Sequence, residues 1–189
     1  KEIEGFSGGH FLARWDRTIS ETSDMQLQAF YNRENRFDLT FQSNFQVSTY
    51  DLDFQHRFQL ADQHEMIWGL GQRFVLDKFD EVFNSSFFQD SRTNYLIGGF
   101  VQDTWTVVPD KLKLTLGTKV SVNSYTGVEL QPNARFLWTI DDKQNLWAAF
   151  SRAVRTPSRL TDGSRVQLAA QPGPGGSVVL SSLFGDKDV

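Results

Sequence analysis

The three histidines, His10, His56 and His64, are the residues that could most readily bind a metal or transfer protons near neutral pH. A zinc site needs three or four ligands from histidine, cysteine and carboxylate side chains that converge on one point. The histidines fall in different strands or turns of the expected fold, and the chain contains no cysteine. We interpret them as isolated surface or interface residues. We therefore expect no metal site, no cofactor and no catalytic residues, and an enzyme is the least favoured class.

Charged side chains recur with a period of two in several segments. Between residues 50 and 59, charged and amide side chains alternate with aromatic and aliphatic ones, and only His56 interrupts the apolar series. Six charges are expected on the polar face of the fold: Asp51, Asp53, Arg57, Arg73, Lys119 and Arg135. They could contact a passing substrate or an internal domain. Alternatively, they form ion pairs with charges on neighbouring strands of a barrel wall that is exposed to water, where each ion pair contributes about 0–1 kcal/mol of stability.

A third candidate site is the segment 76–93, which is rich in phenylalanine and in acidic residues. Its aromatic residues are Phe79, Phe83, Phe87 and Phe88. Exposed aromatic loops can bind an apolar or planar ligand. The same rings could instead pack neighbouring loops against one another, and the sequence leaves both alternatives open. The acidic residues argue against an anionic ligand at this loop.

The elements that must position these residues are long β-strands. From Leu112 to Val122, apolar residues and Thr118 occupy one face, while Lys113, Thr115, Gly117, Lys119 and Ser121 occupy the other. A transmembrane strand needs about 9–11 residues, whereas an average soluble strand has about 5–6. The alternation predicts that Leu112, Leu114, Leu116 and Val120 share a face with Trp138, and that Lys119 shares the opposite face with Arg135.

Eight such strands are expected, in an antiparallel up-and-down meander. Their approximate ranges are 9–19, 25–35, 45–60, 65–76, 94–107, 111–123, 131–140 and 145–155. Short connections at 20–24, 61–64, 109–110 and 141–144 alternate with long ones at 34–44, 76–93, 123–129 and after 156. Outer-membrane barrels sort their loops in this way, with short periplasmic turns and long extracellular loops. Residues 178–184 could begin a ninth strand.

The tryptophans and the faces of the strands support a membrane barrel. The five tryptophans lie near the short turns, where indole rings would form a girdle at the membrane interface: Trp15, Trp68, Trp105, Trp138 and Trp147. A lipid-facing charge near the bilayer midplane costs about 2–4 kcal/mol, so we assign the charged faces to the lumen. Phe11, Ala13 and Trp15 then face lipid, with Arg14 and Asp16 inward. The alternation does not decide the faces of residues 100–103.

Composition and charge limit the remaining classes of function. The 189 residues have a net charge of −4 and a sequence pI near 5.3, so no basic field attracts nucleic acid. The first residues, KEIEGFSGG, contain no signal peptide. We expect the chain to be a fragment of a longer protein.

Several motifs resemble the barrel of TonB-dependent outer-membrane receptors. They are Phe100-Val-Gln-Asp-Thr-Trp105, Leu112-Lys-Leu-Thr-Leu-Gly-Thr-Lys119, Pro132-Asn-Ala-Arg135 and Leu146-Trp-Ala-Ala-Phe-Ser-Arg-Ala-Val-Arg-Thr-Pro157. Leu12-Ala-Arg-Trp15 and Trp68-Gly-Leu-Gly71 are similar to earlier strands of that family. The resemblance extends over nearly the whole chain, and the order and spacing of the motifs carry it.

The resemblance implies a 22-stranded barrel filled by an N-terminal plug domain, of which residues 1–189 form about eight strands. Residues 157–189 would be an extracellular loop that leads into a further strand. The family imports iron–siderophore complexes, cobalamin, haem or sugars with energy passed through TonB. The implied partners are outer-membrane lipid, the plug, TonB and a small nutrient such as a metal chelate. The chain contains no plug and no TonB box, so transport belongs to the parent protein.

Two other readings of the pattern remain open. One is a soluble β-sandwich or small barrel that presents aromatic loops to carbohydrate or protein. The other is an eight-stranded membrane barrel that is complete in itself. Dependence on detergent separates the soluble module from both membrane proteins.

Overall fold

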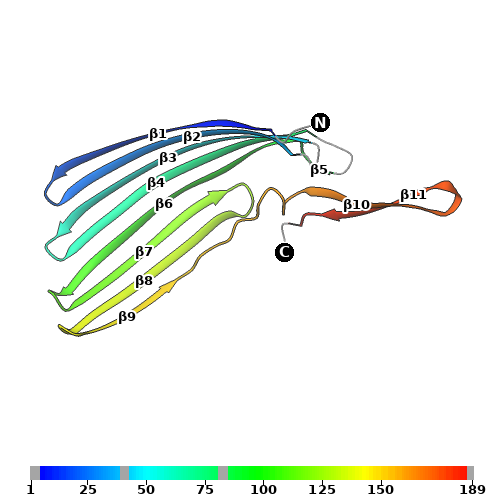
Figure 1. Cartoon of the computed structure of the whole chain (residues 1–189). Helices are drawn as coiled ribbons and strands as arrows, with labels where there is room; N and C mark the ends of the chain where they lie inside the picture. The colour runs from blue at the N-terminus through cyan, green and yellow to red at the C-terminus, as the bar shows by residue number, and fades with distance from the viewer. Residues whose placement is uncertain (1–4, 39–42, 81–84, 187–189) are drawn as a thin grey trace.

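The computed structural model describes residues 5–38, 43–80 and 85–186. Eight long strands form one sheet (Figure 1): β1 (Gly5–Ser20), β2 (Ser23–Asp38), β3 (Ser43–Ala61), β4 (His64–Phe79), β6 (Ser91–Val108), β7 (Leu112–Asn123), β8 (Gly127–Asp141) and β9 (Gln144–Ser151). A second sheet contains β5 (Ser85–Phe87), β10 (Ser164–Pro172) and β11 (Val178–Phe184), with a short 3-10 helix, η1 (Pro174–Gly176), between the last two.

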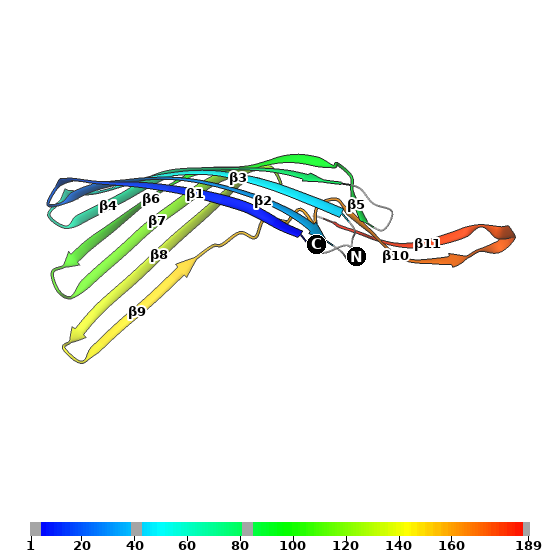
Figure 2. The same cartoon turned by 45° about the horizontal axis from the view of Figure 1, so that its top comes forward.

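The large sheet is an antiparallel meander in the order β1-β2-β3-β4-β6-β7-β8-β9. Each long strand pairs with the next long strand along the chain, which confirms the predicted topology. The sheet is open and curved, and the four short turns lie together at one end (Figure 2). Because β1 and β9 do not pair with each other, the sheet has two open edges within the described residues.

One predicted loop is wrong. The connection expected at 123–129 is a tight turn at residues 124–126. The Asn123 side-chain oxygen accepts hydrogen bonds from the backbone N–H groups of Tyr125, at 2.9 Å, and Thr126, at 2.8 Å. Gly127 then adopts a φ of 75°, which favours glycine. An asparagine that closes its own turn in this way lets β8 begin about four residues before the predicted start.

The last strand of the sheet is shorter than predicted. β9 ends at Ser151, not near residue 155. The backbone N–H of Arg152 donates to the carbonyl oxygen of Pro132 at 3.0 Å. Pro132 has no N–H to donate, so it interrupts further pairing along this edge of β8.

Cross-strand register determines which side chains share a face, since directly paired residues of antiparallel strands lie on the same side. Leu112 pairs with Trp138, and Arg135 pairs with Thr115, which lies on the same face as Lys119. These pairs confirm the predicted sharing of faces. The register also assigns the faces of residues 100–103, which the alternation left undecided. Phe100 pairs with Lys119 on the polar face, whereas Asp103 pairs with Leu116 on the apolar face.

The register divides the five tryptophans. The residue pairs, followed from strand to strand across the sheet, put four tryptophans on the apolar face: Trp15, Trp68, Trp105 and Trp138. Trp147 pairs with Leu137 and therefore lies on the polar face with Arg135. A girdle on the lipid side can include at most four of the five residues, and that girdle stays a prediction.

The large sheet is a single layer with very little core of its own. Among the described residues, the buried apolar side chains are Phe79, at 6% exposure, and Phe87, at 5%. All residues of β1 and β9 are exposed. Backbone hydrogen bonds and cross-strand contacts therefore hold this sheet, and its apolar face has no protein layer over it.

Residues 178–184 form a strand, as expected, but it belongs to the second sheet and not to the large sheet. β11 pairs with β10, and β10 pairs with β5, which comes from the loop between β4 and β6. Residues 178–184 thus complete a hairpin that extends beyond the end of the large sheet (Figure 1). The hairpin closes onto the neighbouring long loop because both lie at the end opposite the short turns.

The division of faces leads to a prediction for the parent receptor in lipid. A spin label at Leu114 should contact lipid, because Leu114 pairs with Trp105 and Phe136 on the apolar face. A label at Lys119 should be shielded from lipid, because Lys119 pairs with Phe100 and Gln131 on the polar face. Relaxation by a lipid-soluble quencher measures the difference. Equal quenching at both positions, or the reverse order, would refute the assignment.

Candidate functional site

Ion pairs tie neighbouring strands together across the polar face. Arg57 of β3 binds Asp24 of β2 at 2.5 Å and lies 3.6 Å from Glu65 of β4. Arg73 of β4 binds Asp51 of β3 at 2.5 Å, and the Asp51 side chain is only 8% exposed. The lateral pairing that the sequence allowed is thus present at both arginines. Both arginines are about half exposed, and ion pairs with an exposed partner contribute little energy individually, although they fix the orientation of the side chains.

A groove lies beside the second of these pairs. It has a volume of about 360 Å³, and its charged lining residues are Asp51, Asp53, Arg73 and Lys119. Gly71 makes room for it, since a Cβ atom at this position would lie 2.5 Å from Asp53 Oδ1. Two carboxylates and two cations therefore line the same recess. This arrangement can bind a polar or zwitterionic group.

The remaining predicted charge on this face lies elsewhere. Arg135 lines a different recess of about 410 Å³ with Lys113 and Trp147. The six predicted charges consequently form three groups: Arg57 with its acidic partners, the four residues of the groove, and Arg135. The structure does not unite them in one site.

The aromatic loop residues divide between packing and exposure. Phe79 and Phe87 are buried against each other, with ring centroids 4.8 Å apart, and Phe45 contacts Phe79 at 5.9 Å. Phe88 is 70% exposed and stacks on Phe184 with centroids 6.4 Å apart. Phe83 lies outside the described residues. Two of the candidate ligand contacts are therefore loop-packing residues, and Phe88 is accessible.

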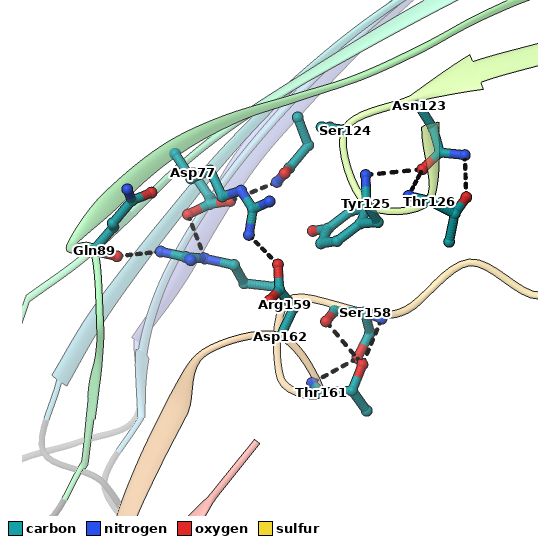
Figure 3. A network of polar contacts seen from close by, with 12 residues as sticks. Asp77, Gln89, Asn123, Ser124, Tyr125, Thr126, Ser158, Arg159, Thr161 and Asp162 are labelled. Atoms are coloured by element: carbon teal, nitrogen blue, oxygen red, sulfur yellow. Dashed lines mark hydrogen bonds and ion pairs between the residues drawn. The ribbon is translucent and has the colours of Figure 1, made fainter. Parts of the chain in front are cut away.

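Sequence reasoning missed a network of polar residues, some of them buried, at the loop end of the sheet (Figure 3). Arg159, in the segment after β9, donates from Nε to Asp77 Oδ1 at 3.0 Å. It also donates to the backbone oxygen of Gln89, and its guanidinium lies 4.5 Å from the centroid of the Phe87 ring. The Asp77 and Arg159 side chains are 4% and 12% exposed. A buried carboxylate is stable only with such partners.

A second arginine lies beside the first. Arg92 of β6 is paired with Asp162, and its guanidinium lies 4.7 Å from the centroid of the Tyr125 ring. Burial raises the pKa of the Tyr125 phenol, against the opposing charge of Arg92. Burial also raises the pKa of Asp77, which lies at the rim near the end of β4, and Arg159 opposes this rise. No local pattern reveals this network, because its ion pairs join residues 70 and 82 positions apart.

The histidines lie apart from one another, as expected. His56 accepts a hydrogen bond from Trp68 Nε1 at 3.3 Å and also contacts Ser23 Oγ at 3.0 Å. His64 contacts Asp103 Oδ2 at 2.8 Å and stacks on Trp105. His10 pairs with Asn32 across β1 and β2. No three histidine or acidic residues in the described ranges are grouped to hold a metal ion.

Both hydrogen-bonded histidines lie on the apolar face, where partners reduce the cost of a polar ring. His56 pairs with Trp68, and His64 pairs with Trp105. The ring pairs also supply edge and stacking contacts, at centroid distances of 6.2 Å and 5.5 Å respectively. Neither histidine approaches the groove, so neither is part of a candidate site on the polar face.

The large sheet is a curved wall with one polar face and one apolar face. This arrangement is typical of a group of neighbouring strands in a large transmembrane barrel. The chain belongs to the family of TonB dependent receptor-like β-barrels, whose family model matches residues 5–181. Members of this family are receptors and transporters of the outer membrane of Gram-negative bacteria, and not enzymes.

A solved structure supports the same fold. The chain is similar to the siderophore receptor PirA from Pseudomonas aeruginosa, with a TM-score of 0.67 and 14% sequence identity. The match covers 97% of this chain and 34% of that receptor, so the chain spans about a third of its structural relative. No curated protein sequence matches the chain. In the described part of the chain, no helix is long and apolar enough to cross a membrane.

Proposed function

We propose that this chain is a wall segment of an outer-membrane receptor that imports a nutrient such as an iron–siderophore complex. The observation that carries the proposal is the curved antiparallel sheet, polar on one face and apolar on the other, within a family match of residues 5–181. The siderophore receptor of similar fold favours a metal chelate over other nutrients. The segment has no transport activity by itself, because a transport path requires a closed barrel.

In this proposal each face of the sheet has its own partner. The apolar face contacts lipid of the outer membrane, and the polar face lines a lumen occupied by a plug domain of the same protein. The groove at Asp51, Asp53, Arg73 and Lys119 faces that lumen and is a candidate contact with the plug or with a passing ligand. Energy for import comes through TonB, which acts on a part of the receptor outside this segment.

Uptake of labelled iron tests the proposed function. A strain that lacks the parent gene should lose import of one class of ferric siderophore, and the full receptor should restore it. A protonophore should abolish the restored uptake, because energy passed through TonB comes from the inner membrane. Expression of residues 1–189 alone should restore nothing and serves as the control. Unchanged uptake of every chelate, cobalamin, haem and sugar tested would contradict a role in nutrient import.

A further inference from the structure

The recess beside Arg135, near the short-turn end of the polar face, has the composition of an anion site. It extends over β6, β7, β8 and β9, and its volume of about 410 Å³ is typical of small-ligand pockets, which measure about 300–1,000 Å³. Its charged lining residues are Lys113 and Arg135, and no acidic side chain lines it. In the groove at Asp51 and Asp53, by contrast, two carboxylates balance two cations. We call the positively charged recess the cationic recess.

Its two cations have no ion-pair partner among the described residues. On the same face, Arg57 and Arg73 bind carboxylates of neighbouring strands. No ion pair within the described ranges includes Lys113 or Arg135, and both residues are exposed. A guanidinium can bind a carboxylate through two parallel hydrogen bonds, and an ammonium beside it adds a second positive charge. The cationic recess therefore favours an anion from outside the wall.

The register adds hydroxyl groups to the two cations. Thr104 pairs with Thr115, and Thr115 pairs with Arg135, so these three residues lie in one row across β6, β7 and β8. The two threonine hydroxyls are half-buried and lie 3.4 Å apart. One hydroxyl can donate to the other, and the second then has a proton to donate to an anion.

An indole ring supplies an apolar wall. Trp147 is 72% exposed, although it lies on the polar face. Leu137 pairs with both Lys113 and Trp147, and the small side chain of Ala149 leaves space beside the indole on the same face. Within the described part of the chain, the indole makes no stacking or cation–π contact. Its face is therefore available to stack on a flat ligand.

We propose that the cationic recess binds a flat organic anion, such as an aromatic carboxylate. The carboxylate binds Arg135 and Lys113, and the ring of the ligand stacks on Trp147. The place of this site in transport rests on the proposed function, in which the polar face lines the lumen and the short turns are periplasmic. An anionic nutrient that leaves the lumen past this part of the wall would then meet the cationic recess.

Fluorine NMR tests the site in the full receptor, with fluorinated tryptophan incorporated, non-ionic detergent as the solvent and benzoate as the probe. The resonance of Trp147 is identified by its absence from the Trp147→Phe variant. At constant ionic strength, benzoate should shift this resonance saturably, whereas chloride should not. Arg135→Gln should weaken benzoate binding at least about tenfold, because it removes charge-assisted hydrogen bonds. No saturable shift, or an unchanged affinity in Arg135→Gln, would overturn the proposal.

The charge-matched control is Arg14→Gln. Arg14 lies on the polar face of β1, where it donates hydrogen bonds to Gln28, and it does not line the cationic recess. This variant should bind benzoate as the unmodified receptor does. An equal loss in Arg14→Gln and Arg135→Gln would mean that benzoate responds only to the overall charge of the face, and the site would be wrong.

A neutral probe separates the two parts of the recess. Benzyl alcohol has the same ring as benzoate without its charge, and its partition into the micelle is followed by the resonances of the tryptophans on the apolar face. It should not shift the Trp147 resonance saturably, and binding as tight as that of benzoate would overturn the role of the cations. Binding in micelles requires no transport. A receptor that binds benzoate but restores no uptake contradicts the proposed function alone, and one that restores uptake without binding benzoate contradicts the cationic recess alone.

Discussion

In plain buffer without detergent, the isolated chain is expected to associate into large particles or precipitate. The sheet exposes many large apolar side chains on one face, among them Phe11 at 63%, Leu70 at 59% and Val120 at 46%. Burial of one such side chain is worth about 1.5–3 kcal/mol, so several together strongly favour any process that removes them from water. The open edges of β1 and β9 also present backbone groups that can pair with another copy.

Light scattering combined with circular dichroism measures this outcome. In detergent micelles the chain should be soluble and rich in β-structure, because the micelle covers the apolar face. Closure of β1 onto β9 is a poor alternative, since about eight strands enclose only a narrow interior that side chains must fill. The polar face instead contains charges and a groove. A folded, monodisperse monomer in plain buffer would show that the apolar face is already covered, and would favour the soluble module.

The second large effect is expected from a charge on the apolar face. In the full receptor folded in phospholipid vesicles, Leu70→Arg should lower the free energy of unfolding by about 2–4 kcal/mol, the usual cost of an arginine facing lipid near the midplane. Leu70 pairs with Phe54 and Gly99, and none of these residues offers a partner for the new charge. Urea titration followed by tryptophan fluorescence measures the loss.

The matched control is Gln55→Arg, at nearly the same depth on the opposite face. Gln55 pairs with Gly69 next to the Phe54–Leu70 pair, so only the sidedness of the new arginine differs. In a wet lumen this substitution should change the free energy of unfolding by about 0–1 kcal/mol. Equal losses for the two variants would mean that the two faces have the same surroundings, and the membrane assignment would be wrong.

The sequence predicted the strands and most of their faces because both depend on local order. Apolar and polar residues alternate with a period of two within each strand, as from Leu112 to Val122. Short turns make consecutive strands neighbours in the sheet, which gives a meander. The sequence placed Trp147 in the girdle but could not fix its face, because its neighbours Leu146 and Ala148 are also apolar and show no polar side of the strand. Pairing with Leu137 settled that face.

Asp103 shows the same limit on the other face. A rule that sends every charge to the lumen would place it inward, but its partner Leu116 puts it on the apolar side, where His64 binds it. The aromatic loop was likewise open to two interpretations from sequence. Burial of Phe79 and Phe87 in the structure decided between packing and exposure for those two residues.

The sequence by itself thus determined an antiparallel wall with one apolar and one charged face, since that information repeats every second residue. Only the tertiary structure decided how the loops meet. The pairing of β5 with β10 and the contacts of Arg159 with Asp77 and of Arg92 with Asp162 join residues about 70–80 positions apart. Such contacts depend on how the eight strands bring their loop ends together, and no spacing within a single segment encodes them.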